Sequence, residues 1–296
     1  MLFRGLSAFP VTPCAENGAI DVDALLRVLA PIRAAGVQSV GLLGSTGSYM
    51  FLERDQRRLA IEAAADFLGP DVPVIASVGS LRTDAAIALA RDARDAGAAG
   101  LLLAPVSYTP LTDDEVFDHF MAVASVTDLP VCFYNNPGTT HFSIGAPLLS
   151  RLAGIDTVVA VKNPAVEAAR MKETHDATVA AVRQDLAIGY SGDWLTADAL
   201  LAGGAAWYSV IGGILPAQAV SLTRAALAGD ATETRRLDDR LQPIWNLFRE
   251  LSSYRVVHAA ANILGLSPHQ PPLPIQPLRP ADRQRVEAAL ESIPAS

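Results

Sequence analysis

The chain has 296 residues, half of them apolar, and a formal net charge of −8 at pH 7. That balance leaves no basic surplus to neutralise phosphates, so nucleic acid is excluded as the expected partner. No apolar run approaches the roughly 18 residues that a membrane helix requires, and the N-terminus has no long apolar leader. We therefore expect a cytoplasmic protein without a membrane partner. Cys14 and Cys132 are too few and too far apart to suggest a disulfide framework or a metal cluster.

From the N-terminus to about residue 230, short apolar runs alternate with longer amphipathic segments. The runs have the length and β-branched content of buried strands, which predicts strands at Gly5–Phe9, Ser39–Leu43, Pro73–Ser77, Gly100–Ala104, Val131–Tyr134, Val158–Val161, Leu186–Gly189 and Ala206–Val210. The segments after them have helical spacing, which predicts helices at Asp23–Ala35, Glu53–Leu68, Asp84–Ala96, Asp113–Val126, Ile144–Leu152, Ala165–Arg183, Trp194–Ala202 and Pro216–Ala228. Thr112 and Glu115 form a capping-box sequence at one of these helix starts.

Eight strand–helix units are typical of two α/β folds, a (β/α)8 barrel and a doubly wound sheet. The count favours the barrel, and the first predicted strand lacks the Gly-x-Gly-x-x-Gly turn of a dinucleotide-binding sheet. Beyond residue 230 only helical patterns follow. We predict an α/β fold with a (β/α)8 TIM barrel over residues 1–230, which carries the active site, and a C-terminal helical extension over residues 231–296 packed on the barrel.

The most unusual residue next to a predicted strand is Lys162, one of only two lysines in the chain. It directly follows the apolar run Val158–Val161, where an ammonium group is costly unless it is paired, neutralised or used. Arginine cannot lose its proton to act as a nucleophile, so a lysine retained in an arginine-rich chain indicates amine chemistry. Two structural alternatives stay open, a lysine that snorkels to solvent and a buried ion pair.

In such a barrel the active site lies at the carboxyl ends of the strands and in the loops that follow them. The strand ends and the loops after them are Gly44–Ser48, Pro105–Pro110, Tyr134–Thr140, Lys162 and Ile211–Ile214, and their polar groups are expected to converge on one site. The turn after the second strand has the form of an anion cradle of backbone N–H and hydroxyl groups, although an ordinary turn fits equally well. Tyr134 fits either a reactive hydroxyl or a core aromatic with a satisfied hydroxyl.

The remaining polar residues indicate structural positions. The five histidines show no ligand spacing, so we expect no bound metal. Lys172, in Met171-Lys172-Glu173, has the surroundings of a solvated helix residue. Asp193 follows Ser191-Gly192 and is predicted to cap a helix.

Taken together, Gly44-Ser45-Thr46-Gly47, Tyr134-Asn135 and the strand-borne Lys162 resemble the dihydrodipicolinate synthase and N-acetylneuraminate lyase family of Schiff-base aldolases. The resemblance runs over essentially the whole chain. It implies that Lys162 forms the Schiff base, that Tyr134 shuttles protons, and that a 2-oxo acid carboxylate is bound by Ser45, Thr46 and Gly47.

The same resemblance adds three candidates for substrate contact or proton relay, Tyr108, Thr139 and Ile211. It also implies a homo-oligomer, a tetramer or a dimer, in which Tyr108 reaches across an interface. No metal and no organic cofactor are expected for Schiff-base chemistry of this kind. The expected partner is a small-molecule 2-oxo acid substrate.

Several positions depart from the family pattern. Ser48 stands where a glutamate is usual, Tyr108 lies one place later than a pair of tyrosines, and Asn163-Pro164 replaces an acidic and a hydroxyl residue. Thr139 stands where the synthase has an arginine that binds a substrate carboxylate, and the loss of such a clamp is not a conservative change.

These departures shape the expected function. We expect a Schiff-base-forming lyase, an aldolase or a dehydratase, acting on a small 2-oxo acid such as pyruvate or a 2-keto-3-deoxy sugar acid. Two alternatives stay open: a true 4-hydroxy-tetrahydrodipicolinate synthase that joins pyruvate and aspartate semialdehyde, and a catalytically silent barrel that binds a 2-oxo acid.

Overall fold

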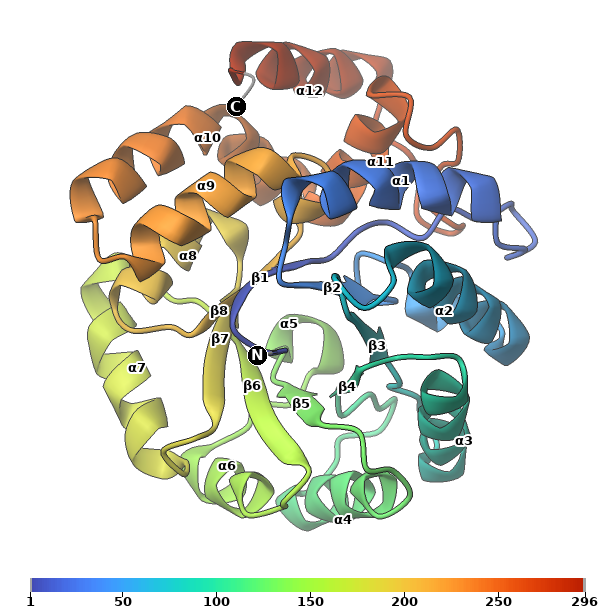
Figure 1. Ribbon diagram of the computed structural model, residues 1–296, viewed down its shortest axis with the longest axis vertical. Coiled ribbons are helices and arrows are strands. Elements are labelled where there is room, and N and C mark those ends of the chain that lie inside the picture. Colours follow the sequence, from blue (N-terminus) through green and yellow to red (C-terminus); the bar gives the residue numbers. More distant parts are fainter. Residues whose placement is uncertain (1, 295–296) are drawn as a thin grey trace.

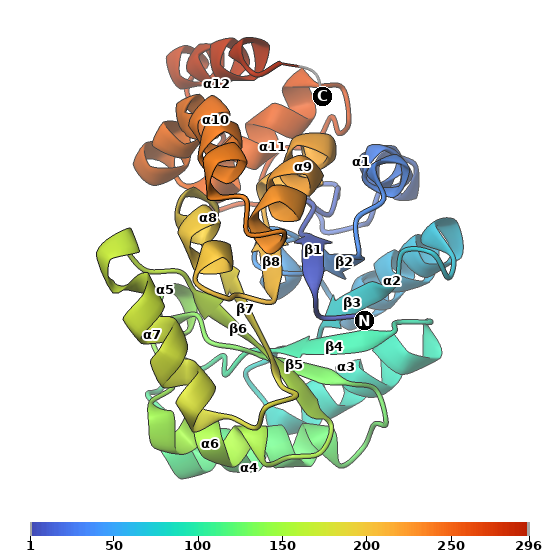
Figure 2. The same cartoon turned by 60° about the vertical axis from the view of Figure 1, so that its left-hand side comes forward.

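A computed structural model describes residues 2–294, in which parallel strands close into a barrel surrounded by helices (Figures 1 and 2). Each strand pairs with the next one along the chain, and the last pairs with the first. The predicted (β/α)8 barrel is thereby confirmed. The strands are β1 Gly5–Ala8, β2 Ser39–Leu42, β3 Val74–Ser77, β4 Gly100–Leu103, β5 Val131–Tyr134, β6 Val158–Pro164, β7 Ala187–Ser191 and β8 Ala206–Ser209.

Helices follow the strands, and all of them except the single turn α5, which lies at the carboxyl ends of the strands, cover the outside of the barrel (Figure 1). They are α1 Val22–Ala35, α2 Arg54–Leu68, α3 Thr83–Asp95, α4 Asp113–Ala124, α5 Pro137–Thr140, α6 Ala146–Ala153, α7 Ala168–Ala181, α8 Asp193–Leu201 and α9 Pro216–Leu227, with 3₁₀ turns at Tyr49–Phe51 and Ile211–Gly213. The predicted capping box of Thr112 and Glu115 opens α4. The single turn α5 was not predicted; Pro137 takes its first position, where the missing N–H costs nothing.

Three further helices extend the barrel at one side, drawn in orange to red in Figure 1. They are α10 Ala231–Leu251, α11 Ser253–Ile263 and α12 Pro280–Ser292. Helix α10 packs on α8 and α9, and α11 and α12 pack on α10. The buried Trp245 ties α10 together, because its indole N–H donates to Asp238 at 2.9 Å. Among residues 2–294, no helix combines the length and the apolar character that crossing a membrane demands.

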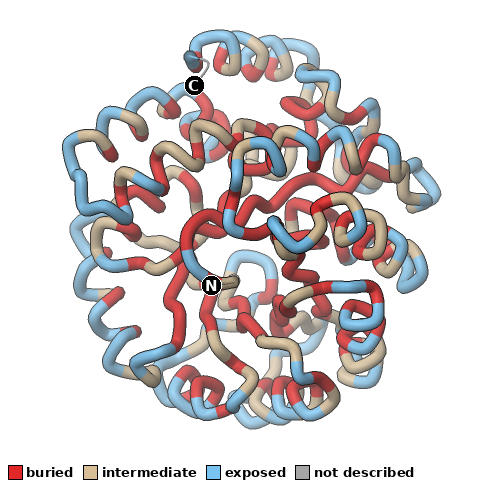
Figure 3. The backbone as a smooth tube through the Cα atoms, viewed as in Figure 1, coloured by how far each residue is buried: buried red, intermediate tan, exposed pale blue. Residues whose placement is uncertain are grey.

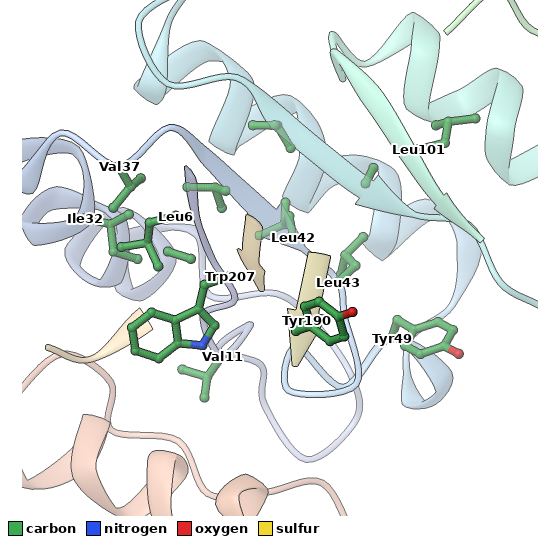
Figure 4. Close-up of a cluster of buried hydrophobic side chains, with 14 of the residues drawn as sticks. Leu6, Val11, Ile32, Val37, Leu42, Leu43, Tyr49, Leu101, Tyr190 and Trp207 are labelled. Carbon is green, nitrogen blue, oxygen red and sulfur yellow. The ribbon is translucent and has the colours of Figure 1, made fainter. Parts of the chain in front are cut away.

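Two apolar layers hold the barrel together, and buried residues follow the strands throughout (Figure 3). The larger layer lies between strands and helices and includes Leu6, Ile32, Leu42 and Trp207 (Figure 4). A smaller layer fills the inside of the barrel. Side chains of a strand alternate between these two layers, because successive Cβ atoms point to opposite faces.

Strand β6 breaks this alternation once. Val131 pairs with Val158, but the next residue of β5, Cys132, pairs with Ala160, so Val159 is an extra residue. Val158 belongs to the outer layer, whereas Val159 packs against the inner layer and Ala160 lies within it. This β-bulge shifts the phase of the rest of β6 by one residue. Lys162 therefore points into the barrel; without the bulge it would face the helices.

Candidate active site

Lys162 lies inside strand β6, not at its end. The predicted strand Val158–Val161 continues to Pro164, and Lys162 pairs with Tyr134 on β5 and with Gly189 on β7. The residue is only 4% exposed. The snorkelling alternative is therefore excluded. A buried ion pair does not form either, since no carboxylate among residues 2–294 lies within 4.0 Å of its Nζ.

Three aromatic rings surround the amine of Lys162. The Nζ atom lies 3.7 Å from the ring centroid of Phe9, 4.2 Å from that of Tyr134 and 5.6 Å from that of Tyr208. Glycines make room for these rings. A Cβ at Gly41 would lie 2.2 Å from Phe9, and one at Gly189 would lie 2.4 Å from Tyr208.

Gly44 has the same role, because a Cβ there would lie 2.6 Å from the Phe9 ring. The first glycine of the Gly44–Gly47 turn is thus explained by packing. Gly47 is tightly enclosed as well, with Thr12 Oγ1 2.8 Å from the position of a Cβ. The sequence alone could not separate this packing requirement from an anion cradle.

Burial lowers the pKa of Lys162 from its ordinary 10.5 to about 7. The cause is desolvation, since the rings replace water around the amine and disfavour its charged form. The weaker influences of Cys132 and Asp193 act in the opposite direction. A substantial share of the amine is consequently neutral, and so nucleophilic, near neutral pH.

The Tyr134 hydroxyl lies in a polar cluster next to the amine. Asn136 Nδ2 donates to Tyr134 Oη at 2.8 Å. Burial raises the pKa of Tyr134, and hydrogen bonds with Ser45, Ser191 and Asn136 oppose that rise. The phenol therefore stays protonated at neutral pH and can both donate and accept a proton.

A cavity of about 330 Å³ opens above the amine at the carboxyl ends of the strands. Five of the eight predicted site residues line it: Ser45, Thr46, Tyr134, Thr139 and Lys162. They come from β2, β5 and β6 and their loops, far apart in the sequence. In the structure these side chains lie together at one end of the barrel, as expected from their places at the strand ends.

The other three candidates lie outside the cavity lining. Gly47 is the buried last residue of the Gly44–Gly47 turn. Tyr108 is 96% exposed in this chain, and Ile211 is fully buried with its N–H donated to Asp193 at 2.6 Å. Within one copy of the chain, neither the Ile211 nor the Tyr108 side chain reaches a substrate in the cavity.

Asp193 is not the helix cap that the sequence predicts. Gly192 takes the cap position in a left-handed conformation, with φ 93°, and turns Asp193 into the cavity wall. Its carboxylate accepts the N–H groups of Ile211 and Val210 and the indole N–H of Trp207. Burial raises the pKa of Asp193, and these donors oppose the rise. The residue braces the turn after β8 beside Lys162.

Sequence reasoning missed several polar residues of the cavity, namely Asn136, Ser191, Ser252, Ser253 and Tyr254. Asn136 is the second residue after β5 and Ser191 is the last residue of β7, so a search of the strand ends could have singled them out. The last three stand at the start of α11, in the C-terminal helices. No local pattern indicates that this segment reaches the strand ends.

Comparison with known proteins agrees with this geometry over the whole chain. The model of the dihydrodipicolinate synthetase family matches residues 2–293. A protein of Syntrophobacter fumaroxidans named 4-hydroxy-tetrahydrodipicolinate synthase is 32% identical over 292 residues, 98% of this chain and 99% of its own length. One of Laribacter hongkongensis with the same name is 33% identical over 284 residues, 95% of this chain and 96% of its own.

A solved structure is more similar still. The crystal structure of dihydrodipicolinate synthase from Agrobacterium tumefaciens is 53% identical, with a TM-score of 0.97, and the match covers 99% of this chain and 98% of that one. Family model, relatives and solved structure thus coincide over nearly every residue from end to end. The chain belongs to the dihydrodipicolinate synthetase family.

Proposed function

We propose that the protein is a class I, Schiff-base-forming lyase, an aldolase or a dehydratase, acting on a small 2-oxo acid such as pyruvate or a 2-keto-3-deoxy sugar acid. The observation that carries the proposal is the amine of Lys162, enclosed by three aromatic rings and with its pKa lowered to about 7. Family membership supports the same reaction type.

The first step joins enzyme and substrate. The neutral Lys162 amine attacks the C2 carbonyl, and the carbinolamine then loses water to give an iminium cation. Tyr134 lies opposite Lys162 in the β5–β6 register, so its hydroxyl can donate a proton to the departing oxygen and recover one later. Asn136, which donates to the same oxygen, fixes the orientation of the phenol.

The iminium then serves as the electron sink for bond cleavage. In an aldol cleavage the C4 hydroxyl loses its proton, the C3–C4 bond breaks, and its electron pair forms an enamine on the lysine. Protonation at C3 and hydrolysis release pyruvate and restore the amine. In a dehydration the C3 proton leaves first, and the C4 hydroxyl departs as water from the resulting enamine.

Within the predicted set of Ser45, Thr46 and Gly47, we assign the carboxylate of the 2-oxo acid to Ser45 and Thr46, because Gly47 does not line the cavity. Ser45 and Thr46 line the cavity and stand next to Tyr134, which binds the Ser45 hydroxyl. Donors fixed in a turn hold the carboxylate at one place and so orient the adjacent carbonyl toward the amine.

The direct test is borohydride trapping. The protein is incubated with pyruvate and sodium borohydride, and the adduct is mapped by mass spectrometry. The chain supplies its own control, because Lys172 is exposed and paired with Asp176 on α7. We expect the adduct on Lys162 and none on Lys172; no adduct on Lys162 with pyruvate or other 2-oxo acids would refute the proposal.

One alternative has a specific observation behind it. The relatives at 32% and 33% identity are named 4-hydroxy-tetrahydrodipicolinate synthase, a name that favours condensation of pyruvate with aspartate semialdehyde. Thr139, which lines the cavity and carries no charge, disfavours it. Assay of both reactions with one preparation decides between them, and an adduct without turnover would identify a silent binder.

We also propose that the protein acts as a homo-oligomer, a dimer or a tetramer, in the cytoplasm. The loops after the adjacent strands β2, β3 and β4 carry large apolar side chains exposed in the single chain, Met50, Phe51, Leu81 and Tyr108. Such groups are typical of protein–protein contacts. Sedimentation velocity tests the assembly, and a monomer at micromolar concentration would contradict it.

A further inference from the structure

Resting on the proposed function, we propose a substrate class for its site: the far end of the cavity binds an uncharged, hydroxyl-bearing tail of the 2-oxo acid, and Tyr254 is the residue that selects it. This end is formed by the junction of α10 and α11, where Ser252, Ser253 and Tyr254 line the cavity together with Phe248. The reactive barrel and the C-terminal helices thus share one site.

The junction has a costly backbone conformation. Ser252 joins the two helices with φ 75° and ψ 127°, a region that residues with a Cβ rarely adopt. A glycine would relieve this strain but would remove the hydroxyl. Such strain persists where the surrounding structure or the function requires it.

Tyr254 is held in a fixed position. Its hydroxyl lies 2.6 Å from the Ser48 hydroxyl, a hydrogen bond between residues 206 positions apart in the sequence. Its ring packs on His258, with 4.6 Å between centroids. Ser48 itself has a left-handed backbone, with φ 58°. The contact links the turn after β2, which carries Ser45 and Thr46, to the start of α11.

The strained residues gather around this one cavity. Among residues 2–294, positive φ outside glycine occurs at Leu43, Ser48, His141 and Ser252. Leu43 and Ser48 flank the turn that holds Ser45 and Thr46. His141 ends α5, which carries Thr139, and Ser252 lines the cavity itself. The backbone near the cavity is therefore strained at three places, the turn after β2, the end of α5 and the α10–α11 junction, as expected of a wall that recognises a ligand.

The charges of the cavity wall decide what this end can bind. Of the residues that line the cavity, Lys162 and Asp193 carry a charge, and both lie at the base. Lys162 reacts with the C2 carbonyl, and the Asp193 carboxylate already accepts hydrogen bonds from the turn after β8. A second carboxylate or a phosphate on the substrate would be desolvated with no cation to pair with it, which is unfavourable.

The polar groups at this end are neutral instead. Ser252, Ser253 and Tyr254 supply hydroxyls from the junction, Thr139 supplies another from α5, and each hydroxyl can both donate and accept a hydrogen bond. Such groups match the hydroxyls of a sugar-derived chain. The volume of about 330 Å³ is at the lower end of small-molecule sites, which suits a short chain.

The test measures imine formation, so that it does not depend on turnover. The full-length protein is trapped with borohydride over a range of concentrations of five 2-oxo acids: pyruvate, 2-keto-3-deoxygluconate, 2-keto-3-deoxygalactonate, 2-oxoglutarate and 2-keto-3-deoxy-6-phosphogluconate. Half-saturation is read from the adduct on Lys162. We expect at least one of the two sugar acids with an uncharged tail to half-saturate the protein at a concentration about tenfold or more below that of pyruvate. The two compounds with a second anionic group should need higher concentrations than pyruvate.

Variants assign the selectivity to the junction. Tyr254→Phe keeps the ring and removes the hydroxyl, and Ser253→Ala removes a second hydroxyl at the same end. Ser125→Ala, at the end of α4 and away from the cavity, is the matched control. We expect Tyr254→Phe to raise half-saturation for the sugar acid about tenfold and for pyruvate clearly less, and Ser125→Ala to leave both within twofold of the wild type.

The outcomes separate the two proposals. An adduct with pyruvate but no preference for a neutral sugar acid overturns the inference and leaves the Schiff-base function standing. Tighter trapping of 2-oxoglutarate or the 6-phosphate, or an equal effect of Tyr254→Phe on pyruvate and sugar acid, also overturns it. No adduct on Lys162 with any of the five compounds overturns the proposed function, and the inference with it.

Discussion

The two ends of the barrel carry hollows of different size and different chemistry. Where the strands begin, hollows of about 740 and 640 Å³ are lined by residues such as Arg33, Asp71 and Glu62. Where the strands end, the cavity has only about 330 Å³. The charged side chains of the larger hollows are exposed to water, whereas the smaller cavity contains the buried amine of Lys162. A reactive site depends on functional groups that are close together and shielded from water, so the volume of a cavity alone does not identify it.

The largest expected effect comes from the buried amine itself. Lys162→Met should lower kcat/KM by about four or more orders of magnitude, because no side chain remains to form the imine. The same variant should be more stable, by roughly 2–4 kcal/mol at pH 7, because folding no longer requires a lysine to lose its proton. Steady-state kinetics and urea unfolding measure the two effects.

This stability gain should depend on pH. The folded pKa of about 7 lies below the ordinary 10.5, so above pH 7 only the unfolded state keeps the proton on Lys162. The cost to the wild type is full below pH 7 and declines by about 1.4 kcal/mol per pH unit as pH rises toward 10.5. The difference between Lys162→Met and wild type should therefore shrink from pH 7 to pH 9. A constant difference would contradict a lowered folded pKa.

The next effect in size concerns the neighbouring phenol. Tyr134→Phe should lower kcat by about 10²–10³, since proton transfer to and from the carbinolamine loses its carrier. The Lys162 adduct should still form, but more slowly, in a borohydride-quenched time course. An unchanged rate would leave Tyr134 as a packing residue only.

A smaller, graded effect is expected from pH in the wild type. The rate of imine formation should rise through pH 7, where the amine becomes neutral, and level off above it. Tyr134 does not interrupt the plateau, because burial holds its pKa above the ordinary value. Quenched-flow trapping with pyruvate between pH 5.5 and 9 gives the profile; a rate that falls over this range would exclude the free amine as the nucleophile.

The smallest kinetic effect should come from the opposite end of the barrel. Gln38 accepts the N–H of Leu6 at 2.7 Å beside the hollow of about 740 Å³. Gln38→Leu removes that acceptor and should cost about 1 kcal/mol of stability, with kcat/KM within twofold of wild type. A large kinetic effect would mean that the two ends are coupled.

Much of the barrel could be predicted because each unit carries its own local signal. The apolar runs and the Thr112–Glu115 capping box are legible within a dozen residues. The lysine was found from the same kind of local signal, because it is one of two lysines in the chain and stands at the end of such a run. Its direction could not be predicted, because it depends on the single extra residue Val159 and on pairing with β5.

The misses share a physical cause, which is contact between distant segments. Asp193 follows a glycine at a helix start, a typical cap sequence, but the backbone of Gly192 turns it toward Trp207 and Ile211. Tyr254 reaches the cavity only because α10 and α11 fold back over the strand ends. The division into residues 1–230 and 231–296 stays a prediction, and the cavity draws residues from both parts.

The bulge in β6 has a consequence for anyone who would build this chemistry elsewhere. Grafting a lysine onto the sixth strand of an unrelated barrel copies the functional group but does not ensure that its side chain points into the barrel. In a regular strand the residue four places after Val158 would share its outward face, and the amine would lie among helices. Deleting Val159 should therefore abolish activity, because Lys162 would point away from the cavity although all reactive residues are still present in the chain. The unit to transplant is the irregular strand, and the lysine is only one part of it.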